Sequence, residues 1–179
     1  MIWLLMACKQ GPILEPLGPV DPTPLAYGRD RKRMNIDQVA ASIERVTGQS
    51  WEELDENGAQ VQLFEDLSGS LGKPDYLAAT EEDLAPGLLF QKFLDDAARS
   101  TCIAAAESER PGQGAYLMLE EAPQDTVRAL ILRFHGHEWP ASDERLDPWL
   151  DLYAVAETPE RGWALVCVGL ITHPDFYTY

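Results

Sequence analysis

Basic residues are scarce in this sequence. Lysine and arginine number 14 against 30 aspartate and glutamate residues, which gives a formal net charge of −16 for the 179-residue chain. Nucleic acids and anionic lipid surfaces both attract basic patches, so this balance argues against either as a partner. The one basic cluster, residues 29–33, is short, and we interpret it as the solvated end of a linker.

Recognised catalytic and cofactor motifs are also missing. The three cysteines, Cys8, Cys102 and Cys167, form no C-x-x-C or C-x-x-C-H motif, which excludes covalent c-type haem and ligation by paired cysteines. There is no G-x-S-x-G nucleophile elbow and no H-E-x-x-H zinc motif. We therefore predict no catalytic residue and no cofactor from motifs. Only the three histidines offer ligands for a divalent metal ion.

The first cysteine follows a short apolar segment without charge, residues 1–7. The tetrapeptide Leu5-Met6-Ala7-Cys8 resembles a bacterial lipobox, with leucine three positions before the cysteine and a small residue directly before it. The resemblance implies that residues 1–7 are the remnant of a longer signal peptide and that the Cys8 thiol carries a lipid after export. The alternative is a cytosolic protein with an irregular N-terminus.

Residues 8–34 form the predicted lipid-anchor site and tether. Five prolines and three glycines occur between residues 9 and 28, a density that blocks helix and favours extended, polyproline-like chain. A segment of this length reaches at most about 60 Å. Such a tether would hold a folded domain away from a membrane, so we expect the protein in the cell envelope, facing the periplasm or the cell exterior.

Apolar residues with helical spacing dominate residues 35–179. Together with a capping-box pattern at Asn35 and N-cap signals at Ser142 and Thr158, they predict helices at about 36–47, 87–107, 123–134, 143–154 and 159–172. The segment His173-Pro174-Asp175 is expected to end the last of these helices. The turn signal Glu56-Asn57-Gly58 permits a hairpin, but its flanks lack strand alternation, so we expect a short helix and a loop there. The predicted fold class is all-α, a single domain built as a compact bundle of about five to six helices.

Cys102 and Cys167 each lie on the apolar stripe of a predicted helix. Phe90 and Leu94 precede Cys102 on its stripe, and Trp163 precedes Cys167. An oxidising compartment allows two such cysteines to pair. We therefore predict a Cys102–Cys167 disulfide if the chain is exported. The alternative is two buried, unpaired cysteines that pack as small apolar residues.

The C-terminal stretch RGWALVCVGLITHPDFYTY, with GKPDYL and LFQKFLDDAARSTC earlier in the chain, resembles parts of large exported proteins from planctomycetes and myxobacteria. Those proteins are linked to c-type cytochrome domains, and their function is not established. The resemblance covers scattered parts of residues 34–179 and implies an exported helical domain that works beside haem proteins. It implies no catalytic residue, and the haem-binding motif of that group is missing here.

Three histidines are the candidate metal ligands. The segment FHGHEW places His135, His137 and Glu138 just after a predicted helix, and His173 follows another in THPDF. Imidazoles and a carboxylate suit Zn²⁺ or another divalent ion if the helix ends meet, and an open coordination position can activate water. The alternative is a helix C-terminal turn, in which Gly136 is left-handed and the histidines cap carbonyl groups.

Three functions remain open at this point. The first is a lipid-anchored envelope protein without catalytic activity, which presents an acidic helical domain to a partner with a basic surface. The second is a metal-dependent enzyme that uses His135, His137 and His173. The third is a docking subunit for a periplasmic cytochrome, whose basic face would meet the negative charge of this chain. A site that joins the three histidines would favour the second.

Overall fold

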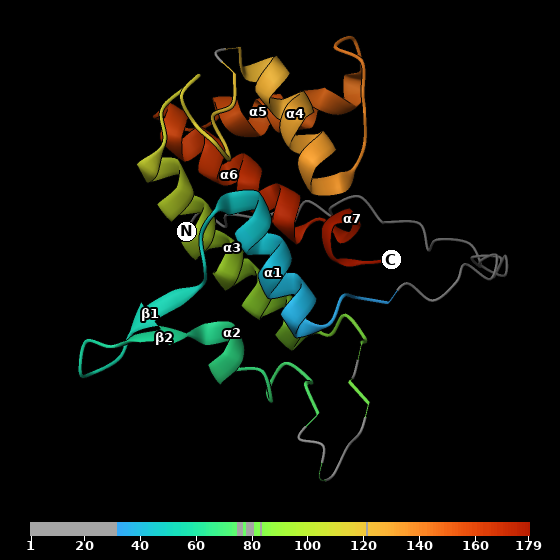
Figure 1. Cartoon of the computed structure of the whole chain (residues 1–179). Coiled ribbons are helices and arrows are strands. Elements are labelled where there is room, and N and C mark those ends of the chain that lie inside the picture. Colours follow the sequence, from blue (N-terminus) through green and yellow to red (C-terminus); the bar gives the residue numbers. More distant parts are fainter. Residues whose placement is uncertain (1–31, 75–76, 78–80, 83, 121) are drawn as a thin grey trace, which may run out of the picture. The chain divides into compact units, whose positions relative to one another are not determined.

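The structure, a computed structural model, describes residues 32–74, 77, 81–82, 84–120 and 122–179. These residues hold seven α-helices, one 3₁₀ helix and a two-stranded hairpin, so the fold is all-α as predicted (Figure 1). Among them, no helix combines the length and apolarity needed to cross a bilayer. The predicted signal-peptide remnant, the lipidation site Cys8 and the predicted tether up to residue 31 lie outside the described residues.

Helix α1 (Ile36–Thr47) begins and ends as the sequence predicts. The Asn35 side chain accepts the Gln38 backbone N–H at 2.8 Å, and the Gln38 side chain accepts the Asn35 N–H at 3.1 Å, which completes a capping box. Gly48 ends the helix at φ 68°, a conformation that favours glycine, and the Tyr116 ring fills the space where a side chain would lie. The buried face contains Ile36, Val39, Ile43 and Val46.

Helices α3 (Leu88–Ser108) and α6 (Pro159–Thr172) form the central pair of the bundle (Figure 1). The buried stripe of α3 is rich in alanine, and small side chains let two helices approach closely. These alanines are Ala97, Ala98, Ala105 and Ala106. Helix α6 begins at the predicted signal, with Thr158 as N-cap and Pro159 as its first residue.

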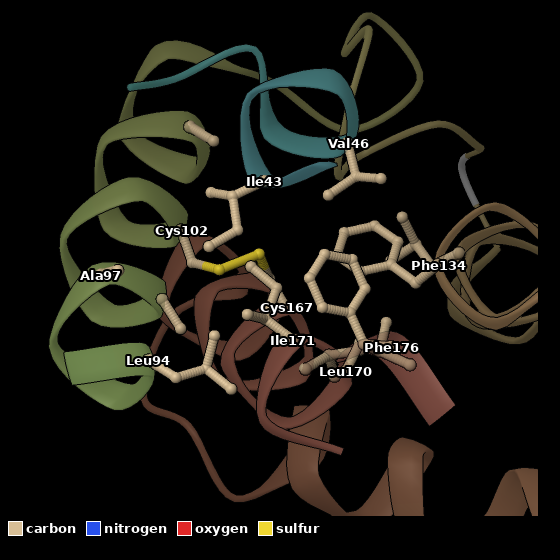
Figure 2. Close-up of a cluster of buried hydrophobic side chains, with 14 of the residues drawn as sticks. Ile43, Val46, Leu94, Ala97, Cys102, Phe134, Cys167, Leu170, Ile171 and Phe176 are labelled. Atoms are coloured by element: carbon tan, nitrogen blue, oxygen red, sulfur yellow. A yellow bond between two sulfur atoms is a disulfide. The ribbon is translucent and has the colours of Figure 1, made fainter. Parts of the chain in front are cut away.

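The two cysteines meet inside this central pair. Cys102 on α3 and Cys167 on α6 are joined through their sulfur atoms, and their Cα atoms are 5.8 Å apart (Figure 2). That separation lies within the range of about 4.4–6.8 Å that disulfides span. Both side chains are fully buried and belong to the same apolar cluster as Ile43 and Val46 of α1 (Figure 2). The predicted approach of the two cysteine-bearing stripes is therefore confirmed.

Two shorter helices, α4 (Pro123–His135) and α5 (Asp147–Ala154), pack against α6. The 3₁₀ helix η1 (Glu144–Leu146) leads directly into α5. Its N-cap is Asp143 rather than the predicted Ser142, because the Asp143 carboxylate accepts the backbone N–H two residues further on. The start of this helical segment therefore lies one residue later than the sequence indicates.

A β-hairpin is the main difference from the predicted secondary structure. Strands β1 (Glu52–Leu54) and β2 (Gln60–Gln62) pair where we predicted a short helix and a loop, so that prediction is wrong; the short helix α2 (Leu63–Asp66) follows only afterwards. The turn is built by Asp55, whose side chain accepts two backbone N–H groups, and by Gly58 at φ 79°. Most strand positions are exposed, so the apolar alternation that identifies a half-buried strand is absent.

The folded body begins earlier than predicted, at a buried arginine. Arg33 is 1% exposed, and its guanidinium donates to the Leu71 carbonyl at 2.8 Å. It also pairs with Glu82 at 3.1 Å and lies 4.7 Å from the centre of the Phe90 ring. Arg33 therefore belongs to the domain rather than to the tether, and the interpretation of the basic cluster as solvated is wrong at this residue.

Candidate metal site

The first pair of site residues lies where the chain reverses at Gly136. Gly136 ends α4 at φ 71°, as the sequence predicts, and its N–H donates to the Leu132 carbonyl at 3.0 Å. His135 is the last residue of α4 and His137 is the first residue after the turn. Both imidazoles therefore leave the same end of the helix.

The second pair lies at a break before Pro174. A residue that precedes proline is disfavoured in a helix, and His173 has φ −69° and ψ 137°, which ends α6. Pro174 is then the first residue of the short helix α7 (Pro174–Tyr177). His173 is the N-cap of α7, and its Nδ1 accepts the Asp175 backbone N–H at 3.2 Å. His173 and Asp175 therefore stand together at the start of α7.

An aromatic contact brings the two helix ends together. Phe134 directly precedes His135, Phe176 directly follows Asp175, and their ring centres are 6.0 Å apart (Figure 2). Both rings are buried. Because each ring is the sequence neighbour of a polar site residue, their packing fixes the end of α4 against the start of α7.

The polar side chains converge at this contact. One imidazole nitrogen of His135, one of His173 and a carboxylate oxygen of Asp175 all lie within 4.8 Å of one another. The ring centres of His135 and His173 are 4.9 Å apart. His137 joins the group through the carboxylate, since its Nε2 lies 3.2 Å from Asp175 Oδ2. Two imidazoles and one carboxylate are thus close enough to share an ion.

His135 has the protonation pattern that a metal ligand needs. Its Nε2 lies 2.9 Å from the Leu170 carbonyl oxygen, which can only accept, so Nε2 carries a proton. In the neutral imidazole this leaves the lone pair of Nδ1 available. Burial lowers the pKa of His135 below its ordinary value of 6.5, and His173 and His137 act in the same direction, although the hydrogen bond to Leu170 and the negative charge of Asp175 oppose them. The neutral ring therefore prevails near pH 7.

Asp175 is held in its ionised form. The hydrogen bond from His137 lowers the pKa of Asp175 below its ordinary value of 3.8, and this outweighs the opposing effect of burial. The side chains of His173 and Asp175 are 43% and 35% exposed, so ions in solution can reach them. An ionised carboxylate beside a neutral imidazole is the combination that binds divalent metals.

Two tryptophans restrict the histidine rings. The Trp149 ring lies edge-on to His135 and His173, with centres 6.0 and 6.2 Å away. Trp139 stacks on His137, with ring centres 5.8 Å apart and planes 7° from parallel. All three imidazoles thus have an aromatic neighbour, which limits the side-chain entropy that an ion would have to remove.

The structure brings the three predicted histidines together, but not as three equal ligands. His135 and His173 can share an ion, whereas His137 contacts the carboxylate of Asp175. Sequence reasoning missed Asp175 as a ligand. The signal for it is the His-Pro-Asp sequence, because the proline begins a helix and places both polar residues on its first turn. Glu138, the predicted neighbour of these histidines, lines a hollow beside α4 instead.

Comparison of this chain with protein-family models, curated proteins and solved structures finds no match. The resemblance of the C-terminal stretch to exported, cytochrome-linked proteins therefore stays a prediction. The candidate site is argued from its own geometry.

Proposed function

We propose that this chain is an accessory module of the cell envelope that binds a divalent transition-metal ion through His135, His173 and Asp175. The observation that carries the proposal is the convergence of three ligand atoms within 4.8 Å of one another. Two imidazole nitrogens with one carboxylate oxygen suit zinc, nickel, copper(II) or iron(II), whereas Mg²⁺ and Ca²⁺ prefer oxygen ligands. Three protein ligands leave a coordination position for water or for a group on a partner.

The groups around the three ligands support the proposal. A metal-binding histidine commonly donates its other N–H to a carbonyl, and a metal-binding carboxylate commonly accepts a further hydrogen bond. His135 has such a bond to Leu170, and Asp175 has one from His137. Both bonds orient a ligand and leave the Nδ1 atom of His135 unused. The cluster thus has the supporting contacts of a metal site as well as the ligands.

Metal binding requires that His173 exchange one hydrogen bond for a bond to the ion. While its Nδ1 accepts the Asp175 N–H, the proton of the neutral ring lies on Nε2, so neither nitrogen offers a lone pair to an ion. Coordination therefore replaces the N-cap bond of α7. Loss of an N-cap costs about 1 kcal/mol, which is small beside the roughly 8 kcal/mol of a micromolar complex. The exchange lowers the affinity of the site without preventing binding.

Calorimetric titration of the purified protein tests this proposal. We expect one Zn²⁺ or Ni²⁺ ion per chain with micromolar or tighter affinity, and no comparable binding of Mg²⁺. Asp175→Asn should weaken zinc binding at least about tenfold. The matched control is Asp95→Asn, which alters an exposed carboxylate paired with Arg99 on α3 and should leave zinc affinity unchanged. Equal affinities of the two variants, or no saturable binding below about 100 µM, would contradict the proposal.

We also propose that a lipid on Cys8 holds the domain at a membrane. The lipobox resemblance and the proline-rich segment after it support this location. A cysteine pair at disulfide distance fits an oxidising compartment as well. In a detergent phase-separation assay on cells that express the full gene, Cys8→Ser should move the protein from the detergent phase to the aqueous phase. Equal partition of both forms would remove the anchor from the proposal.

A further inference from the structure

An apolar groove opens at the surface beside the two central helices. It has a volume of about 390 Å³ and lies between α3, α6 and the residues that follow α5. Three of its apolar side chains are exposed: Ile103 at 48%, Val155 at 72% and Leu165 at 37%. Contiguous exposed apolar side chains mark sites where a protein meets a partner. The groove is therefore a candidate interaction surface.

Charged residues stand on both sides of Ile103 along α3. Arg99 lies one turn before it and Glu107 one turn after it, and both side chains are exposed. Residues four positions apart share one face of a helix, so the three form a row of a positive charge, an apolar side chain and a negative charge. A second α3 in antiparallel orientation would place its glutamate opposite Arg99 and its arginine opposite Glu107. The row is thus complementary to a reversed copy of itself.

Two further features of α3 favour such an approach. Ser100 and Ala104 lie beside the row, are exposed, and are small enough to let a second helix come close. Arg99 is bonded to Asp95 on its own helix at 2.8 Å, but both partners are accessible to solvent, and an exposed pair of this kind contributes little energy. The guanidinium can therefore turn toward a second carboxylate.

The net charge of −16 per chain opposes the association of two copies. Exposed charges farther apart than about 8 Å are largely screened at physiological ionic strength, whereas charges that face each other within a contact are screened much less. The pattern on α3 therefore acts at short range, where it is attractive, and the overall charge keeps the association weak.

We propose that two copies of this chain associate through α3, about a twofold axis that passes beside Ile103. Each Arg99 then faces Glu107 of the partner subunit, and each Ile103 lies against the groove of the other copy. The contact is isologous, because the same surface serves on both sides, and it closes at two copies. None of the three proposed metal ligands lines the groove, so this inference does not rest on the proposed metal-binding function.

Sedimentation equilibrium of the full chain tests the dimer. The chain carries Cys8→Ser, so that no disulfide through this cysteine joins two copies, and a chelator removes any shared metal ion. At about 0.15 M salt we expect a monomer–dimer equilibrium with a Kd between about 1 and 100 µM. Ile103→Glu should weaken the dimer at least about tenfold, because it buries a charge at the axis. The control Arg45→Glu alters an exposed residue of α1 and should leave the Kd unchanged.

Charge reversal tests the antiparallel orientation. Arg99→Glu alone sets two acidic side chains against each other, and Glu107→Arg alone sets two basic ones, so each should weaken the dimer about tenfold. Since Glu107→Arg makes the net charge less negative, a weaker dimer in this variant cannot come from overall repulsion. The double variant restores opposite charges across the axis, and its Kd should lie within about threefold of the unaltered value.

Each of three results would overturn the proposal. A monomer at every concentration up to about 300 µM would do so and would leave the groove to a different partner. A dimer that survives Ile103→Glu with unchanged affinity would place the contact elsewhere. Single charge variants whose combination does not recover the dimer would reject the twofold pairing of α3. Circular dichroism checks folding, and if Ile103→Glu does not fold, the charge variants at exposed positions carry the test.

Discussion

Arg33, the buried residue at which the folded body begins, contacts parts of the chain that are distant in sequence. Arg33 reaches the Leu71 carbonyl, the Glu82 carboxylate and the Phe90 ring. The guanidinium satisfies this mixture of partners because it offers several donors in one plane and a flat face for an aromatic ring. A lysine has no such plane, so Arg33 is specified by its surroundings and not only by charge.

Substitution of Arg33 should destabilise the domain. Arg33→Met keeps an apolar stem of similar length but removes the partner of Glu82, which is 16% exposed. Removal of one member of a buried pair costs about 3–5 kcal/mol, and the partial exposure of Glu82 favours the lower end. Urea unfolding measures the loss. The control Arg45→Met, at an exposed position of α1, should change the unfolding free energy by less than about 0.5 kcal/mol. Similar values for both variants would show that Arg33 is not a structural anchor.

His137 is expected to act on metal affinity through Asp175. His137→Phe keeps an aromatic ring beside Trp139 but removes the Nε2 hydrogen bond to the carboxylate. Loss of such a supporting bond typically weakens metal binding about 10–100-fold. Zinc titration measures this change, and urea unfolding of the same variant should show nearly unaltered stability. Unchanged zinc affinity would mean that the bond does not position Asp175.

At the scale of elements, the central pair of helices depends on its disulfide. Cys102 and Cys167 are 65 positions apart in sequence, and closure of a loop of that length stabilises the folded state by about 4 kcal/mol in the chain-entropy model. Unfolding in urea with a reducing agent should therefore show a midpoint well below that of the oxidised protein. A thiol assay on protein from the native host, denatured without reductant, should find neither cysteine free. Two reactive thiols at these positions would contradict the bridge and weaken the case for export.

Helix ends position the site, and their local signals are readable in the sequence. Gly136 and Pro174 are the residues that end or begin helices beside the histidines. The sequence predicts both breaks, together with the capping box at Asn35 and the Thr158 cap, because each rests on residues within one turn. These local signals do not show which helix ends pack against each other. The contact between Phe134 and Phe176 brings the end of α4 to the start of α7, and this contact depends on the packing of the whole bundle.

At the scale of the whole molecule, the features missed from sequence depend on partners far along the chain. His135 bonds to a carbonyl 35 residues away, and His137 bonds to a carboxylate 38 residues away. Arg33 pairs with a carboxylate 49 residues away. Neither composition nor periodicity carries such information. The hairpin escaped prediction for a separate reason, since its exposed strands bury too little apolar surface to leave a pattern.

The backbone pairing of Lys32 with Tyr179 has a mechanical consequence. A force applied through the N-terminal segment enters the domain at Lys32 and meets first the hydrogen bonds to the C-terminal residues. Directly behind Lys32 the load reaches Arg33, whose buried guanidinium is bonded to the Leu71 carbonyl and the Glu82 carboxylate. The covalent link between α3 and α6 lies further inside and would keep that pair together. If Cys8 carries the proposed lipid, a pull on the segment before Lys32 would therefore be resisted at the edge of the domain, by the pairing with Tyr179 and by the buried Arg33.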